Sequence, residues 1–287
     1  METNEALQLI INNQVNSHRE LFNHISQQKN RQQEYDQYFQ YSDIRSFLIR
    51  EKIAERRKFI IKTDHPIAIR SNDHIAPWGT MNDCTRSPRF VAACERQLKR
   101  KLCALDMGCS GGGIVYDFLH RGHDAVGLEG SDFSLKSQRA EWRVIPDNLF
   151  TCDITQPFKI EDKKNNSLVE FDIITMWEVM EHIHEVDLPV MFNNINKHLK
   201  ADGYFVGSIA LGDDVVNGVS YHPTLHERPW WVEKFKELKF KMLDHSFLSF
   251  GDYCRGTGNG PLDPNYQINP EIGFHFIAQK YNLNDYF

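Results

Sequence analysis

The chain has 287 residues, of which 25% are charged and 12% aromatic, and its formal net charge is −6. That length holds one large domain, or one domain with an appendage, and the acidic balance predicts no strong attraction to nucleic acids or anionic membranes. No stretch approaches the roughly 18 consecutive apolar residues of a membrane span. Six cysteines without metal-ligand spacing, and a start without the features of a signal peptide, predict a soluble, cytoplasmic protein.

Residues 1–62 differ from the rest and are predicted to form a helical N-terminal extension. They are rich in glutamine, asparagine, arginine and glutamate, and the first 60 contain neither proline nor glycine. Two interpretations stay open: a solvated helix lying on the domain, and a coiled-coil or hairpin arm through which the chain forms a homo-oligomer. Both depend on apolar residues that recur at a roughly helical spacing, namely Leu7, Ile11, Val15, Phe22 and Ile25.

Residues 63–101 are predicted to form a lid-like loop followed by a helix over 90–101. Three prolines and a glycine mark the first part as loop: Pro66, Pro77, Pro88 and Gly79. Trp78 and Thr80 belong to a Pro-Trp-Gly-Thr element in this loop. Such a loop either covers a ligand, as functional loops commonly do, or only anchors a connection against the core, and both interpretations stay open.

The remainder of the chain is organised around residues 102–132. An apolar run over 102–105 ends at Asp106, a glycine-rich turn occupies 108–113, and a helical pattern leads to a second apolar run that stops at Glu129. Strand, turn, helix and strand with an acid at its tip form a βαβ unit suited to a nucleoside. An acid two residues before the first glycine would repel a phosphate, so it favours a cationic ligand.

This stretch resembles the first two motifs of the class I S-adenosylmethionine-dependent methyltransferases, whose cofactor carries an ammonium and a sulfonium. The resemblance implies that the strand-end acids and the turn bind this cofactor: Asp106, Gly108, Cys109, Ser110, Gly111, Glu129 and Gly130. It also assigns two residues after a third strand, over 148–152, to the adenine: Asp153 for the amino group and Ile154 for the ring. The expected cofactor contacts are completed by Trp177, Trp78 and Thr80.

Further strands are predicted over 171–177, 204–211 and 272–281 and within 240–250, with helices over 188–199 and 230–238. Strands and helices alternate up to the fifth strand. We therefore predict an α/β fold with a doubly wound, seven-stranded, mostly parallel sheet and an antiparallel edge, the Rossmann-like layout of the class I methyltransferases. The cofactor-binding domain is expected over 102–287, and the resemblance covers about residues 75–285.

The candidate catalytic residues lie just after the fourth predicted strand, over 171–177: Glu178, Glu181 and His182. On a helix these positions would share one face, and a carboxylate beside a histidine orients it and raises its basicity. Methyl transfer to a hydroxyl requires alignment with the methyl group and removal of a proton. We therefore interpret His182 as a general base, with Glu181 or Glu178 as its orienting partner or as a substrate contact.

The same residues with His226 also suit a divalent metal. The pattern E-x-x-E-H with a later H-E-x-x-W resembles the metal-dependent small-RNA 3′-end 2′-O-methyltransferases, which implies the ligand set Glu178, Glu181, His182 and His226. Metal-free relatives that methylate quinone precursors and sugars share E-V-x-E-H, so the favoured interpretation includes no metal. The acidic net charge argues against RNA, because phosphate contacts require Lys and Arg.

The segment over 221–240 resembles the tail of methyltransferases encoded near glycan-assembly enzymes, in which a histidine-containing loop and a Trp-Trp pair border the acceptor pocket. We therefore predict an O-methyltransferase that acts on a hydroxyl of a sugar, a glycan or a similar small polar acceptor. The alternatives are a metal-assisted RNA 2′-O-methyltransferase and a cofactor-binding scaffold that recruits a partner through its N-terminal helix.

Overall fold

The computed structural model describes residues 47–260 and 263–281. The chain divides into two compact units, Met1–Leu48 and Ile49–Phe287, and the second contains nearly all of the described residues. The predicted oligomerisation arm lies outside the described residues. Within them, no helix has the length and apolar character that crossing a membrane requires.

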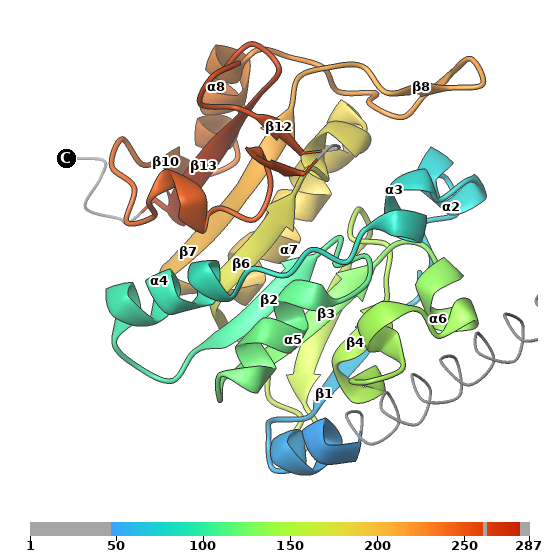
Figure 1. Ribbon diagram of the computed structural model, residues 1–287, viewed down its shortest axis with the longest axis vertical. Helices are drawn as coiled ribbons and strands as arrows, with labels where there is room; N and C mark the ends of the chain where they lie inside the picture. Colours follow the sequence, from blue (N-terminus) through green and yellow to red (C-terminus); the bar gives the residue numbers. More distant parts are fainter. Residues whose placement is uncertain (1–46, 261–262, 282–287) are drawn as a thin grey trace, which may run out of the picture. The chain divides into compact units, whose positions relative to one another are not determined.

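The second unit is built on a seven-stranded sheet, drawn in Figure 1 from green to red. Its strands lie in the order β10-β13-β7-β6-β2-β3-β4. Neighbours from β7 to β4 are parallel, whereas β13 is antiparallel to both β7 and β10. This confirms the predicted mostly parallel sheet with an antiparallel edge. The strands span Cys103–Met107 (β2), Asp124–Glu129 (β3), Leu149–Thr151 (β4), Phe171–Trp177 (β6), Leu199–Ala210 (β7), Phe240–Met242 (β10) and Gly273–Lys280 (β13).

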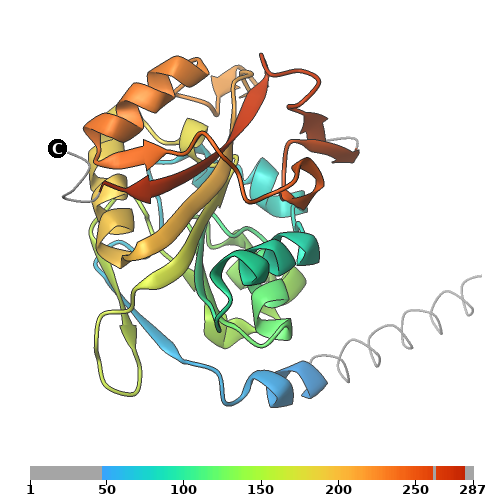
Figure 2. The same cartoon turned by 90° about the vertical axis from the view of Figure 1, so that its left-hand side faces the viewer.

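Helices cover both faces of this sheet, because each central strand is apolar on both sides. Neighbouring residues of β2 show the alternation: Ala104 belongs to the core under α4 (Pro88–Leu98) and α5 (Gly113–His120), and Leu105 to the core under α7 (Leu188–His198) and α8 (Arg228–Glu237). Figure 2 shows the helices on either side of the sheet. On the α7 side, the rings of Phe192 and Phe235 meet edge to face at 4.9 Å.

Residues 59–62 correct the prediction of a helical extension that reaches residue 62. They belong to β1 (Phe59–Thr63), which pairs antiparallel with β5 (Phe158–Asp162). The run Phe-Ile-Ile-Lys-Thr is rich in aromatic and β-branched residues, which favour a strand. Phe59 is buried against Phe171 with ring centroids 6.3 Å apart, so this strand is fixed to the domain.

Short elements that the sequence did not predict surround the carboxyl edge of the parallel strands. The lid-like segment contains two short helices, α2 (Asn72–Ile75) and α3 (Trp78–Asn82), in place of continuous loop. Beyond β3 the chain forms the short helix α6 (Phe133–Ser137) and single 3₁₀ turns. Two small hairpins follow later in the chain: β8 (Val215–Val216) with β9 (Val219–Ser220), and β11 (Thr257–Gly260) with β12 (Asp263–Asn265).

Candidate functional site

A cavity of about 480 Å³ opens where the parallel strands end. That edge is the expected place for a ligand in a doubly wound sheet. The strand order β4-β3-β2-β6-β7 divides the cavity along the edge, with Glu129 and Asp153 at one end and Glu181 and His182 at the other. All but two of the predicted cofactor-binding residues line it: Thr80, Asp106, Gly108, Cys109, Ser110, Glu129, Gly130, Asp153, Ile154 and Trp177.

Gly111 and Trp78 are the two exceptions. Gly111 lies behind the cavity wall, where an added Cβ would stand 2.7 Å from Cys84 Cβ and 2.8 Å from the Asp83 carbonyl oxygen. Its role is therefore to let the lid-like segment approach the turn. The Trp78 side chain lies outside what the structure describes, so its contact with the cofactor stays a prediction.

The glycine-rich turn needs its first glycine for conformational reasons. Gly108 has a φ of +78° and donates its N–H to the Leu128 carbonyl at 2.8 Å. A Cβ at this position would also stand 2.5 Å from Val179 Cγ2. Only glycine adopts this geometry without a steric penalty, and as a result the backbone runs directly along the cavity.

Glu129, at the tip of β3, is tied to the turn and to the lid-like segment. Its Oε2 accepts the Ser110 N–H at 2.7 Å, and its Oε1 accepts the Ser131 N–H at 3.1 Å. Thr80 Oγ1 lies 3.5 Å from the same Oε1. Burial raises the pKa of this carboxyl, although these N–H donors oppose the shift. Oε2 keeps a lone pair for a further donor, which suits a ribose hydroxyl.

Asp106, at the end of β2, is 5% exposed and accepts a hydrogen bond from Thr175 Oγ1 at 2.7 Å. Burial, helped by the charges of Asp83 and Glu129, raises the pKa of Asp106 to about 7. The protein's own groups therefore compensate the charge of Asp106 poorly. A cationic ligand would supply a partner for it.

The residues predicted to hold the adenine lie just beyond β4. Asp153 is buried, and its Oδ1 accepts hydrogen bonds from Thr155 N at 2.9 Å and Thr155 Oγ1 at 2.6 Å. Ile154 is buried and presents an apolar contact to the cavity. Trp177 borders the cavity as well, but most of its ring packs into the core, edge to face with Phe90 at 5.3 Å.

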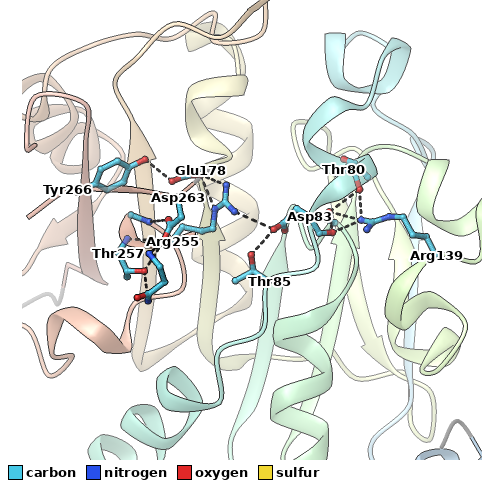
Figure 3. A network of polar contacts seen from close by, with 12 residues as sticks. Thr80, Asp83, Thr85, Arg139, Glu178, Arg255, Thr257, Asp263 and Tyr266 are labelled. Atoms are coloured by element: carbon cyan, nitrogen blue, oxygen red, sulfur yellow. Dashed lines mark hydrogen bonds and ion pairs between the residues drawn. The ribbon is translucent and has the colours of Figure 1, made fainter. Parts of the chain in front are cut away.

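The lid-like segment is clamped to the domain from two sides (Figure 3). On one side, the Arg139 guanidinium donates to the carbonyls of Thr80 and Asp83 and to Ser110 Oγ. On the other, Arg255 forms ion pairs with Glu178 at 2.8 Å and with Asp83 at 3.3 Å. These contacts fix the lid-like segment, which forms the part of the cavity wall that lies outside the βαβ unit.

The structure corrects the predicted helical arrangement of Glu178 with His182, whereas Glu178 does line the cavity, and its role as a substrate contact stays a prediction. This residue has a φ of +53° and is followed by a single 3₁₀ turn, Met180–His182, so no helical face forms there. Its carboxylate accepts hydrogen bonds from Arg255 Nε at 3.0 Å and from Tyr266 Oη at 2.6 Å. Glu178 therefore fastens the C-terminal hairpin region to the sheet, and it does not orient His182.

His182 is paired instead with Asp73, which the sequence did not single out. His182 Nδ1 lies 2.8 Å from Asp73 Oδ2. Burial lowers the pKa of His182, but the close contact and charge of Asp73, with the charge of Glu181, outweigh it and raise the pKa to about 9. Glu181 Oε1 accepts the Ala210 N–H at 2.9 Å, and burial raises the pKa of Glu181 to about 7.

The predicted metal set is not brought together either. His226 is 2.5 Å from Glu185 Oε1 and stacked on Trp230 at 3.9 Å, outside the cavity lining. Among the described residues, a different group has ligand atoms within 4.8 Å of one another: Glu181, His182 and His222. A carboxylate with two imidazoles suits a divalent transition metal, and Glu181 Oε2 is buried without a hydrogen-bond partner, so these residues fit such an ion.

Comparisons with known proteins agree with this geometry. A family model described as a methyltransferase domain matches residues 82–249. No curated protein matches the chain.

Among solved structures, the chain is similar to a TehB-like SAM-dependent methyltransferase from Corynebacterium glutamicum, at 17% identity and a TM-score of 0.46 over 74% of this chain and 99% of that one. It is also similar to an S-adenosylmethionine-dependent methyltransferase from Clostridium acetobutylicum, at 14% identity and a TM-score of 0.48 over 73% and 97%. A third similar structure is the 1,6-didemethyltoxoflavin-N1-methyltransferase from Burkholderia thailandensis, at 16% identity and a TM-score of 0.44 over 73% of this chain and 84% of that one.

Proposed function

The chain belongs to the methyltransferase domain family, and from this premise we propose that it moves a methyl group from S-adenosylmethionine to a hydroxyl of a sugar, a glycan or a similar small polar acceptor. One observation carries the proposal. Buried acids at the ends of neighbouring parallel strands share a cavity with a histidine–carboxylate pair. The acids suit the charged donor, and the pair suits the removal of a hydroxyl proton.

The donor would lie along β2, β3 and β4. Asp106 offers an uncompensated charge to an ammonium, Glu129 Oε2 has a lone pair for the ribose, and Asp153 with Ile154 borders the place of the adenine. The solved methyltransferase from Burkholderia thailandensis has S-adenosylhomocysteine bound, which agrees with this choice of cofactor. A dinucleotide is disfavoured because its pyrophosphate would face these carboxylates.

The acceptor would lie beyond the donor, at the ends of β6 and β7. S-adenosylmethionine, when bound, would supply the methyl carbon to the hydroxyl oxygen, and the electron pair of the carbon–sulfur bond would leave with S-adenosylhomocysteine. His182 takes the hydroxyl proton on Nε2, because Nδ1 faces Asp73. Alignment of the two reacting atoms supplies the rest of the acceleration.

A second candidate is metal-assisted methyl transfer, which the Glu181, His182 and His222 group favours. A divalent ion held there would lower the pKa of a bound hydroxyl and replace the base. RNA is the less favoured acceptor for such an enzyme, since the net charge of −6 opposes phosphate binding. Recruitment as a scaffold and the cytoplasmic location stay predictions.

Thermal unfolding tests the cofactor first. S-adenosylhomocysteine at micromolar concentration should raise the melting temperature, and NAD should not; the reverse result would end the proposal. Transfer of labelled methyl groups to nucleotide-sugars, oligosaccharides and short RNAs then identifies the acceptor. EDTA should leave the activity intact if His182 is the base, and loss of activity that Mn²⁺ restores would establish the metal-assisted candidate.

A further inference from the structure

We propose that Asp73 is the positioning residue of this site, and that helix α2 of the lid-like segment assembles the base by carrying Asp73 to His182. The inference rests on the proposed function, in which His182 receives the acceptor proton. It adds a residue from outside the methyltransferase βαβ unit, about a hundred positions before the histidine it serves.

The geometry gives Asp73 a specific task. Asp73 Oδ2 is 2.8 Å from His182 Nδ1, and the two side chains are 25% and 21% exposed. The contact is an ion pair by distance, and Nδ1 has no hydrogen bond of good geometry, so Asp73 acts on the ring through its charge and stabilises the imidazolium that forms when His182 takes a proton. The ring of His222 meets that of His182 edge to face at 4.5 Å, which limits rotation of the imidazole.

The neighbouring carboxylates each have another partner, although Glu181 Oε2 is left without a hydrogen bond. Glu181 Oε1 accepts the Ala210 N–H, and Glu178 is held by Arg255 and Tyr266. Charged and titratable groups that act on His182 come from several elements: Asp73 on α2, Glu181 on the 3₁₀ turn, Asp214 before β8, and His222 after β9. Of these, Asp73 makes the ion pair with Nδ1.

Helix α2 is seated by contacts with both ends of the cavity. Ser71 Oγ accepts the Asp73 N–H at 3.2 Å and caps the helix. On the acceptor side, Asn72 Nδ2 donates to the Ser220 carbonyl at 2.9 Å, and Tyr221 Oη donates to the Ala76 carbonyl at 3.1 Å.

On the donor side, the Ala68 N–H donates to the Gly130 carbonyl at 2.9 Å, one residue after Glu129. The segment that positions His182 therefore also contacts the predicted ribose site. The position of this segment therefore couples the donor end of the cavity to the contact between Asp73 and His182.

The test is an NMR titration of histidine-labelled full-length protein with S-adenosylhomocysteine bound, in which His182→Gln identifies the His182 signals. Asp73→Asn should lower the pKa of His182 by about 1–3 units and reduce methyl transfer to the acceptor found in the screen about 10- to 100-fold. Asp64→Asn, which removes an exposed acid of the same segment, should change neither.

Asp73→Glu keeps the charge at a longer reach and should restore part of the pKa shift, which separates positioning from damage to α2. The proposal is overturned if Asp73→Asn transfers methyl groups as fast as the wild type, or if Asp73→Glu recovers no more activity than Asp73→Asn while S-adenosylhomocysteine still binds. Failure of S-adenosylhomocysteine to bind would refute the proposed function instead, and the His182 titration of the ligand-free protein would still test the pair.

Discussion

Replacement of Asp106 with asparagine tests whether the cavity recognises its donor by charge. Asp106 is almost fully buried and accepts a hydrogen bond from Thr175 Oγ1. Asparagine has the same shape, and its amide oxygen can keep that bond. The substitution therefore removes the negative charge and leaves the local packing in place.

The expected effect follows from the charge and from the pKa. A charge-assisted hydrogen bond to an ammonium contributes about 1.5–3 kcal/mol, so Asp106→Asn should weaken S-adenosylhomocysteine binding about 10- to 150-fold at pH 8. Because the pKa of Asp106 is about 7 in the ligand-free protein, wild-type Asp106 becomes neutral as the pH falls. Wild-type affinity should then decrease about tenfold from pH 8 to pH 6, and the affinity of the variant should change less.

Isothermal titration calorimetry with S-adenosylhomocysteine at pH 6, 7 and 8 measures both effects, because this ligand keeps the ammonium and lacks the sulfonium. The control is Asp64→Asn, whose carboxylate is exposed and outside the cavity. Equal affinities of the wild type and Asp106→Asn at pH 8 would refute the charge argument. So would a wild-type affinity that is independent of pH over this range.

Three further predictions concern the base and the turn. His182→Ala should lower kcat about 10²- to 10⁴-fold with little change in the Kd of S-adenosylhomocysteine, and an unchanged kcat would remove His182 as the base. In the proposed function the unprotonated imidazole of His182 is the base, and its pKa is about 9. The wild-type rate should therefore rise with pH until about pH 9, and a flat profile between pH 7 and 9 contradicts this. Gly111→Ala should lower the free energy of unfolding by about 1–3 kcal/mol, because the added Cβ would meet Cys84 and Asp83. Urea denaturation measures this change. The control is Gly212→Ala, which has open space around the position and should unfold as the wild type does.

The donor half of the site was predictable because its residues lie at strand ends. Asp106 and Glu129 each follow an apolar run that is typical of a buried strand, and the carboxyl ends of parallel strands meet at one edge. Their convergence therefore follows from the sequence without knowledge of the packing. The mostly parallel sheet was predictable for a related reason, since strands that alternate with helices form parallel neighbours.

The acceptor half depends on contacts between distant parts of the chain. Ser71 before Asp73 is a helix-start signal, but nothing in the sequence says that this helix reaches His182. Arg255 lies in a stretch rich in glycine that is typical of a loop, and only packing places it between Glu178 and Asp83. The sequence does not indicate the left-handed backbone conformation at Glu178 either. This conformation interrupts the helical spacing on which the predicted Glu–His arrangement depended.

The buried acids explain how the cavity can select a cationic donor. Burial raises the pKa of Asp106 and Glu181 to about 7, against 3.8 and 4.5 for the free groups, so their ionisation destabilises the ligand-free protein as the pH rises through this interval. A cationic donor removes this cost at its end of the cavity, whereas a phosphate would increase it. At the acceptor end, Asp213 and Asp214 join the lining, and Arg255 is already neutralised by its two ion pairs. Arg70 and His182 line the same cavity as these acids, so charge selects the donor at its end of the cavity, whereas the acceptor end combines both signs of charge.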